Sequence, residues 1–267
     1  MREQLLLNVL LLRRKKENNM GILIYDNKKY TDEYEIVSYM ADRQTLALPS
    51  SVLKFFQEIA NAHSDEFGFG FENLSKKNAT FLLVNVSMDI TRTPILHEKI
   101  KVTTWSAGRK GIRYIRRTVI EDEKGEIIVN AESVWVLVDT LSHRIITKED
   151  EIGFDLPECD EVCGDLRCGK IVHPDDMTLQ GKRRIRYTDI DYNGHLNNCK
   201  YADFVMDFMP VDVIGKRVSA LDIYFHSEAM EGDKIEIYTG EKDGFIYFHG
   251  VNNGNVCFDA RCKLEQL

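Results

Sequence analysis

A short polar segment carries the side chains of this sequence that are best suited to chemistry. Asp189, Asp191, Asn193, His195 and Asn197 occupy every second position in it. In extended backbone this spacing points all five side chains to one side. Carboxylate, amide and imidazole groups placed together can hold a water molecule, a metal ion or a phosphate, and an imidazole transfers protons near neutral pH.

Other patterns in the sequence narrow this choice. A metal site usually has two or more histidines or several converging carboxylates, and His195 is alone in its segment. The sequence has no G-x-x-x-x-G-K-[ST] or G-x-G-x-x-G pattern for nucleotide phosphates, and no G-x-S-x-G pattern for a serine nucleophile. We therefore expect water activation by acid and base groups, with no cofactor and no metal.

A strand and a helix are predicted to position these groups. The residues from Arg183 onward alternate as in a strand. After the polar segment, apolar residues recur at helical spacing. They are Tyr201, Phe204, Val205, Phe208 and Met209. Asn197 or Asn198 can cap this helix, whose first backbone amides favour developing negative charge.

The same plan occurs earlier in the chain, because residues 34–59 can be laid without gaps over residues 183–208. The aligned pairs are Ile36 with Ile185, Asp42 with Asp191, Gln44 with Asn193 and Leu46 with His195. Since leucine does not titrate, we expect the first copy to be structural and the second to be reactive.

Each copy continues as a meander of strands. Strands are predicted in residues 87–105 with a break at Pro94, and in 112–121, 126–139, 220–240, 245–251 and 256–264. The turns at 122–125 and 252–255 contain glycine where a positive φ would be needed. An antiparallel sheet with one apolar face must be covered, and each half offers one long helix. The sequence thus predicts an α+β fold in which a sheet wraps around a helix, twice.

Four segments follow from this pattern. Residues 30–147 form the non-catalytic domain and residues 181–267 the catalytic one, joined by a linker over 148–180 that is rich in Asp, Glu, Gly and Pro. Residues 1–29 are an N-terminal extension, expected to be disordered in part. Its apolar run, 5–12, is shorter than the roughly 20 residues that span a bilayer. It also lacks the order of a signal peptide, so no stable membrane insertion is expected, with a membrane-surface helix as the alternative.

Composition limits the partners and the compartment. The formal net charge of −8 and a pI near 5.5 argue against nucleic acid. Six cysteines without a secretory signal indicate a reducing, cytoplasmic location. Cys159, Cys163 and Cys168, followed by His173, lack the paired C-x-x-C spacing of common zinc sites, so we interpret them as reduced loop thiols.

Two basic clusters stand out against the acidic total. They are Lys182, Arg183, Arg184 and Arg186, and Arg109, Lys110, Arg113, Arg116 and Arg117. The simpler interpretation is a solvated strand face, and the alternative is a docking surface for an acidic partner.

The run DIDYNGHLNNCKY closely resembles the active-site segment of the acyl-acyl carrier protein thioesterases, in which an Asp-x-Asn-x-His element precedes Asn-Asn and an aromatic residue. The resemblance covers the chain from about Tyr30 onward, including the strand around Trp135. It implies two fused hot-dog folds and assigns catalytic roles to Asp191, Asn193, His195 and Glu228. Members from plants have a cysteine directly after that glutamate, where this sequence has Ala229, so a thiol nucleophile is not expected there.

The resemblance also implies a function. The protein would hydrolyse fatty acyl-acyl carrier protein (acyl-ACP) thioesters to free fatty acid, by water that a carboxylate and His195 activate, with the carrier protein as partner. Which carboxylate acts as base, Asp191 or Glu228, stays open, as does direct attack by Asp191. The alternatives are an acyl-coenzyme A thioesterase and a non-catalytic acyl-binding regulator, although residues 1–29 are short for an output domain. A homodimer through an exposed sheet edge also stays open.

Overall fold

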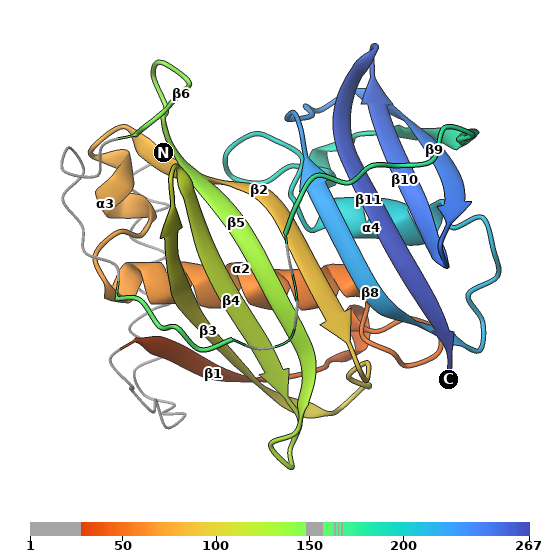
Figure 1. The fold of residues 1–267 in the computed structure, drawn as a ribbon, viewed down its shortest axis with the longest axis horizontal. Helices are drawn as coiled ribbons and strands as arrows, with labels where there is room; N and C mark the ends of the chain where they lie inside the picture. Colours follow the sequence, from red (N-terminus) through yellow and green to blue (C-terminus); the bar gives the residue numbers. More distant parts are fainter. Residues whose placement is uncertain (1–27, 148–156, 163, 165, 167) are drawn as a thin grey trace.

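A single antiparallel sheet forms the framework of the protein in our computed structural model, which describes residues 28–147, 157–162, 164, 166 and 168–267. The strands follow the order β1-β3-β4-β5-β2-β8-β11-β10-β9-β7, and β6 pairs with β5 (Figure 1). Their bounds are β1 Lys29–Glu35, β2 Ala79–Ile90, β3 Lys99–Lys110, β4 Arg113–Glu121, β5 Ile127–Asp139, β6 Arg144–Ile145, β7 Thr178–Arg184, β8 Lys216–Phe225, β9 Lys234–Lys242, β10 Phe245–Asn252 and β11 Asn255–Gln266. The strands predicted at 112–121, 126–139, 245–251 and 256–264 are confirmed to within about two residues. The other predictions are less accurate, because β2 begins at Ala79 rather than at residue 87, residues 220–240 belong to two strands, β8 and β9, and the strand expected from Arg183 onward ends at Arg184.

The two principal helices lie on the same side of this sheet. Helix α2 (Pro49–Glu66) crosses the first group of strands and α4 (Lys200–Asp207) the second, both behind the sheet in Figure 1. The short helix α3 (Phe71–Ser75) follows α2. Each half is therefore a sheet that curves around its own helix, as predicted.

The two halves share one continuous sheet because β2 of the first pairs with β8 of the second. The register runs from Asn85 opposite Tyr224 to Asp89 opposite Ala220. One apolar core also extends through both halves, including buried residues from each helix, such as Phe55 of α2 and Phe204 of α4. The halves are thus packed as one body through both backbone pairing and side chains.

The second helix is shorter than its apolar spacing suggests. Helix α2 has 18 residues, whereas α4 has 8 and ends at Asp207, so Phe208 and Met209 lie beyond it. Pro210 explains the early end, since the residue before a proline disfavours helical backbone.

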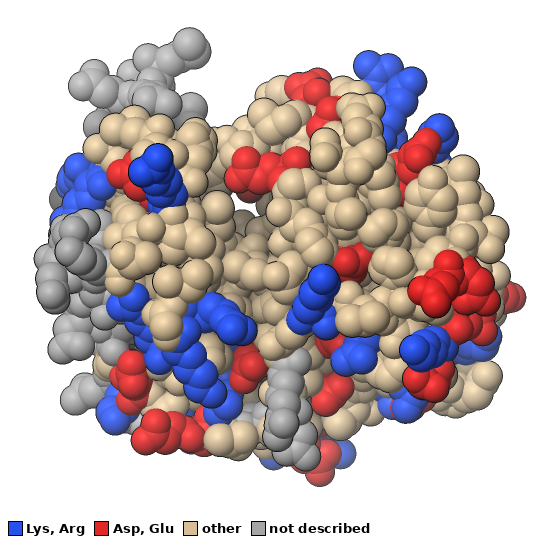
Figure 2. Space-filling model, turned by 45° about the horizontal axis from the view of Figure 1, so that its top comes forward, with Lys and Arg blue, Asp and Glu red and all other residues tan. Residues whose placement is uncertain are grey.

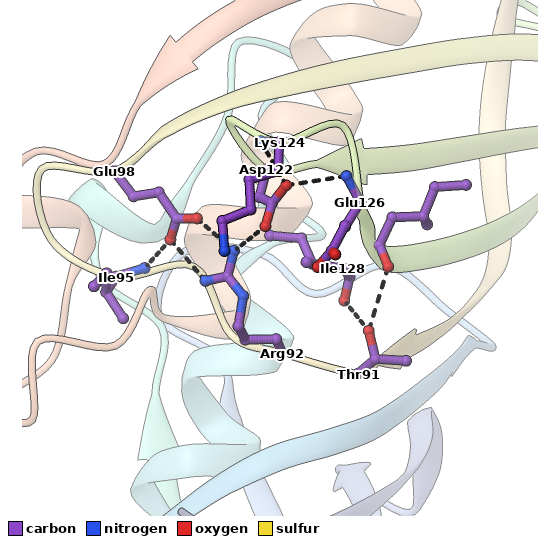
Figure 3. Close-up of polar contacts among 9 residues, drawn as sticks. Thr91, Arg92, Ile95, Glu98, Asp122, Lys124, Glu126 and Ile128 are labelled. Carbon is purple, nitrogen blue, oxygen red and sulfur yellow. Dashed lines mark hydrogen bonds and ion pairs between the residues drawn. The ribbon is translucent and has the colours of Figure 1, made fainter.

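A network of ion pairs holds the loop that joins β2 to β3 (Figure 3). Arg92 binds the Glu98 carboxylate through both terminal nitrogens, at 3.0 and 2.6 Å, and also reaches Asp122 at 3.1 Å. The other Asp122 oxygen accepts from the backbone of the 122–125 turn, where Gly125 has the positive φ, +79°, that the sequence predicts. The network fixes the first-copy loop that corresponds to the loop carrying Glu228.

The described part of the linker contacts β3 and β5 of the first half. Cys159 N donates to Ser106 O at 2.9 Å, and Cys168 Sγ donates to Glu132 O at 3.0 Å. Both cysteines are free thiols, as interpreted from the sequence. Cys163, residues 1–27 and residues 148–156 lie outside the described residues.

Candidate active site

His195 lies in a tight turn rather than in extended backbone. A 3-10 helix, η3 (Tyr187–Asp189), precedes it. Asp191 N then donates to His195 O over 2.9 Å, and Gly194 takes a φ of +86°. The predicted extended row of five polar side chains is therefore wrong.

The Asp191 carboxylate closes this turn. Its Oδ1 accepts hydrogen bonds from Asn193 N at 2.8 Å and from His195 N at 3.4 Å. Aspartate side chains commonly accept from the backbone two residues further on, which makes a polar residue at every second position a property of such a turn as well as of a strand.

The first copy contains the same turn without the histidine. Asp42 Oδ1 accepts from Gln44 N at 2.8 Å and from Leu46 N at 3.0 Å, and Asp42 N donates to Leu46 O at 2.8 Å. Thr45 has a φ of +65° at the position of the glycine. Because the aspartate makes the same two bonds in a copy without an imidazole, we infer that these bonds of Asp191 serve the shape of the turn.

A backbone hydrogen bond brings the turn against the loop that follows β8. Leu196 N donates to Ala229 O at 2.8 Å. As a result, His195 Nε2 lies 3.1 Å from Glu228 Oε2. The two side chains are 32% and 51% exposed, so both lie within reach of solvent.

The first copy has the corresponding hydrogen bond between turn and loop, which we call the joint, but it lacks both the imidazole and the carboxylate. Ala47 N donates to Pro94 O, also at 2.8 Å. The residues that precede these two are Leu46 and Thr93, in the places of His195 and Glu228. Only the second copy can therefore hold an imidazole against a carboxylate at this joint.

All four residues assigned from the resemblance line one cavity of about 400 Å³. This volume is within the range of small-molecule sites. The cavity extends from the turn of the second copy into the interior of the first, between α2 and strands β2, β4 and β5. Among its apolar lining residues are Leu53, Phe56, Phe69, Phe81 and Trp135. A long apolar chain can thus lie in the first half while a polar group at its end reaches the second.

Asp189 and Asn197 accept hydrogen bonds from nearby backbone amides, but the predicted cap of α4 by Asn197 or Asn198 is wrong, because the N-cap residue is Cys199 and α4 has no side-chain cap hydrogen bond. Asp189 is 3% exposed, and its Oδ2 accepts from Arg186 N at 2.9 Å. Asn197 Oδ1 accepts from Cys199 N at 2.8 Å, one residue before α4 begins. Asn198 lines the cavity.

Cys199 is not suited to nucleophilic attack. Its side chain is buried at the start of α4, and Sγ donates to Gln57 Oε1 at 3.5 Å. Burial raises the pKa of this thiol to about 12, so it is protonated at neutral pH. This agrees with the assignment from the sequence, which gave the cysteine no catalytic role.

A second group of histidines lies apart from the turn of His195, and its link to Asp259 was missed in the sequence. His226 Nε2 and His249 Nδ1 each lie 2.7 Å from a different oxygen of the buried Asp259. Burial alone would raise the pKa of Asp259, but these hydrogen bonds outweigh it and lower the pKa. The signal was not visible in the sequence, because the three residues come from separate strands or strand ends.

This group also has the residues for a metal site. His173, from the linker, joins His249 and Asp259 in offering three ligand atoms that lie within 4.8 Å of one another. Both Asp259 oxygens already accept a hydrogen bond from a histidine, so these residues form a hydrogen-bonded network.

Two family models match the sequence. The acyl-ACP thioesterase N-terminal domain matches residues 27–154, and the acyl-ACP thioesterase C-terminal domain matches residues 173–262. Among curated proteins, the chain is 25% identical over 240 residues to a chloroplastic palmitoyl-acyl carrier protein thioesterase of Gossypium hirsutum, covering 84% of this chain and 58% of that protein. It is 26% identical over 220 residues to a chloroplastic dodecanoyl-[acyl-carrier-protein] hydrolase of Umbellularia californica, covering 76% and 56%.

Solved structures show the same fold. An acyl-ACP thioesterase from Bacteroides thetaiotaomicron superposes with a TM-score of 0.83 at 22% identity, over 90% of this chain and 99% of that one. The 12:0-ACP thioesterase from Umbellularia californica gives a TM-score of 0.73 at 20% identity, over 90% and 98%. The predicted double hot-dog fold class is confirmed. The chain spans just over half the length of the curated relatives named above. Among the described residues, no helix has the length and apolar character needed to cross a membrane.

Proposed function

Because the chain belongs to the acyl-ACP thioesterase family, we propose that it hydrolyses fatty acyl-ACP thioesters to free fatty acid and carrier protein. The observation that supports this most directly is the 3.1 Å contact between His195 and Glu228 at a cavity with apolar walls. The curated relatives named above are thioesterases or hydrolases of acyl carrier protein esters, which points to the same substrate.

In the proposed reaction water attacks the thioester carbonyl carbon. A general base takes the proton of the water as the carbon–oxygen bond forms, and the carbonyl oxygen becomes an oxyanion. The carbon–sulfur bond then breaks, and the leaving thiolate takes the proton back from the protonated base. The products are a fatty acid and the thiol of the carrier protein, so the reaction needs no further reactant.

We assign the base to His195 and its support to Glu228. The glutamate contacts Nε2, so in the neutral imidazole Nε2 carries the hydrogen and Nδ1 the lone pair. A carboxylate in this place orients the ring and stabilises the imidazolium that forms when the water loses its proton. Asn193 lines the same cavity and is assigned to hold the water or the oxyanion.

Asp191 is assigned to the turn and not to the chemistry. We therefore expect Asp191→Asn, which keeps an oxygen acceptor for the Asn193 and His195 amides, to retain kcat within about tenfold. Steady-state hydrolysis of one acyl-ACP measures this.

Asp42→Asn, at the matching position of the first copy, is the control for the effect of the same change on folding. A drop of about a thousandfold or more in the Asp191 variant, with a normal unfolding midpoint, would show that this carboxylate takes part in the reaction.

The carrier protein is expected to dock near the catalytic turn. Arg184 and Arg186 lie just before η3, are exposed, and form no ion pair within the described ranges. Acidic and basic side chains are intermixed over the face shown in Figure 2, so the attraction of an acidic partner is expected to be local.

We expect the double variant Arg184→Glu, Arg186→Glu to raise KM for acyl-ACP about tenfold and to leave KM for a small acyl thioester unchanged. The control is Lys242→Glu, since Lys242 is at the end of β9 opposite to Lys234, the register partner of Arg184, about 26 Å away along the strand. Equal KM changes for both substrates would remove the docking assignment.

A panel of acyl-ACP and acyl-coenzyme A esters, each hydrolysed under steady-state conditions by the purified protein, tests the function. We expect a higher kcat/KM for the carrier protein esters. A preference for coenzyme A esters would favour the alternative thioesterase, and binding without turnover would favour the regulator. The cytoplasmic location and the homodimer stay predictions.

A further inference from the structure

A polar row crosses the otherwise apolar interior of the first half. Arg116 of β4 is 9% exposed and lies on the side of the sheet that faces α2. Its register partners are Ser106 of β3 and Ser133 of β5, and directly paired residues project from the same side of a sheet. Ser64 approaches from α2. All four residues line the cavity that also contains the catalytic turn.

The guanidinium of Arg116 has only uncharged hydrogen-bond partners. Its Nη1 donates to His63 Nδ1 at 2.8 Å and to Thr104 Oγ1 at 3.3 Å, and its Nη2 donates to Ser64 Oγ at 3.5 Å. Burial and the neighbouring guanidinium lower the pKa of His63 to about 3, so this histidine is neutral. Across the described ranges no carboxylate forms an ion pair with Arg116.

Two of the five guanidinium N–H groups are left over by these bonds. Burial lowers the pKa of Arg116 to about 10, which still leaves it cationic at neutral pH. A buried cation without a counter-ion is costly, and a purely alkyl chain would offer it nothing in return. A cavity for saturated chains alone would be better lined by an apolar residue at this position.

We propose that this cavity accepts acyl chains that carry an oxygen, as hydroxyl or carboxylate, and that Arg116 hydrogen-bonds this oxygen. The inference depends on the proposed function, since it assumes that the acyl group lies in this cavity. Charge-assisted bonds from a planar guanidinium are strong and directional, which suits both groups.

Helix α2 gives the distance from the catalytic end of the cavity to Arg116, and this distance sets the expected position of the oxygen along the acyl chain. Gln57 contacts Cys199 at the catalytic end, whereas Ser64, seven residues further along, contacts Arg116. At 1.5 Å per helical residue, the polar row lies about 10 Å from that end. An extended chain advances about 3.5 Å over three bonds, so chains of about eight to twelve carbons bring their far end to Arg116.

The test compares thioesters of these lengths that end in a methyl, a hydroxyl or a carboxylate. We expect the wild-type protein to hydrolyse at least one oxygenated series with a kcat/KM at least about tenfold above the methyl series. Whether hydroxyl or carboxylate gives the larger ratio identifies the natural group. In Arg116→Met the ratio of the two kcat/KM values should fall to about one or below, chiefly because kcat/KM for the oxygenated chains decreases.

Arg117→Met is the matched control, because Arg117 is the next residue of the same strand, points to the other face and pairs with Glu132. It should keep the wild-type ratio. If Arg116→Met does not fold, Arg116→Lys is used instead, and the same ratio is expected to fall. Lysine keeps the positive charge but lacks the planar, forked guanidinium. A wild-type preference for methyl-ended chains, or a ratio unchanged in a folded Arg116 variant, overturns the inference. Absence of hydrolysis of every thioester overturns the proposed function instead.

Discussion

Replacing His195 with alanine is expected to lower kcat for acyl-ACP hydrolysis by about two to four orders of magnitude, the usual contribution of a general base. The variant loses the one imidazole that faces Glu228 at the joint between turn and loop. The turn itself should persist, because the bonds of Asp191 Oδ1 go to backbone amides. Steady-state kinetics with a single acyl-ACP measures the loss.

Two further variants are compared with His195→Ala. Glu228→Gln should lower kcat as well, since it removes the charge that stabilises the imidazolium. Leu46→Ala changes the residue in the place of His195 in the first copy and should leave kcat near the wild-type value. A folded His195→Ala protein with unchanged kcat would remove both the site and the assignment of the second copy as the reactive one.

The second large effect is on stability. Phe258→Ala is expected to lower the free energy of unfolding by about 3–5 kcal/mol, the range for truncation of a buried aromatic residue. Phe258 is fully buried, and its ring packs edge-on against Tyr201 of α4 with centroids 4.9 Å apart. It also occupies the space above Gly250, where an added Cβ would lie 2.1 Å from the ring. Denaturant unfolding measures the change.

Tyr39→Ala is the control for this prediction, because its side chain is 79% exposed and its truncation should cost less than about 0.5 kcal/mol. Since Tyr201 lines the cavity, the Phe258 variant should also lose activity before it unfolds. A loss of stability below about 1 kcal/mol for Phe258→Ala would contradict the packing that places α4 and the catalytic turn.

The duplicated plan could be predicted from sequence because each half repeats the same local rules. The alignment of Asp42 with Asp191 agrees with the structure in detail, because the two carboxylates accept the same pair of backbone hydrogen bonds in their turns. The difference in helix length was missed, although Pro210 carried the signal. The extended row was wrong because alternate polar residues also suit a turn closed by an aspartate.

Long-range contacts were harder to foresee. Glu228 was found by resemblance, because no local pattern links it to His195. Arg116 was included in a solvated cluster, yet Tyr114 and Ile120 share its side of β4 and are buried. The alternation of that strand could therefore have placed Arg116 inside. No sequence pattern, however, shows that Arg116 lacks a carboxylate partner within the described structure.

The most direct test of the central claim, that the second copy activates water, is a single turnover in water enriched in oxygen-18. With enzyme in excess over an acyl-ACP, we expect the first fatty acid released to contain one labelled oxygen, because water itself attacks the carbonyl. Unlabelled acid in that first turnover would contradict the account, since its new oxygen would come from a side-chain carboxylate.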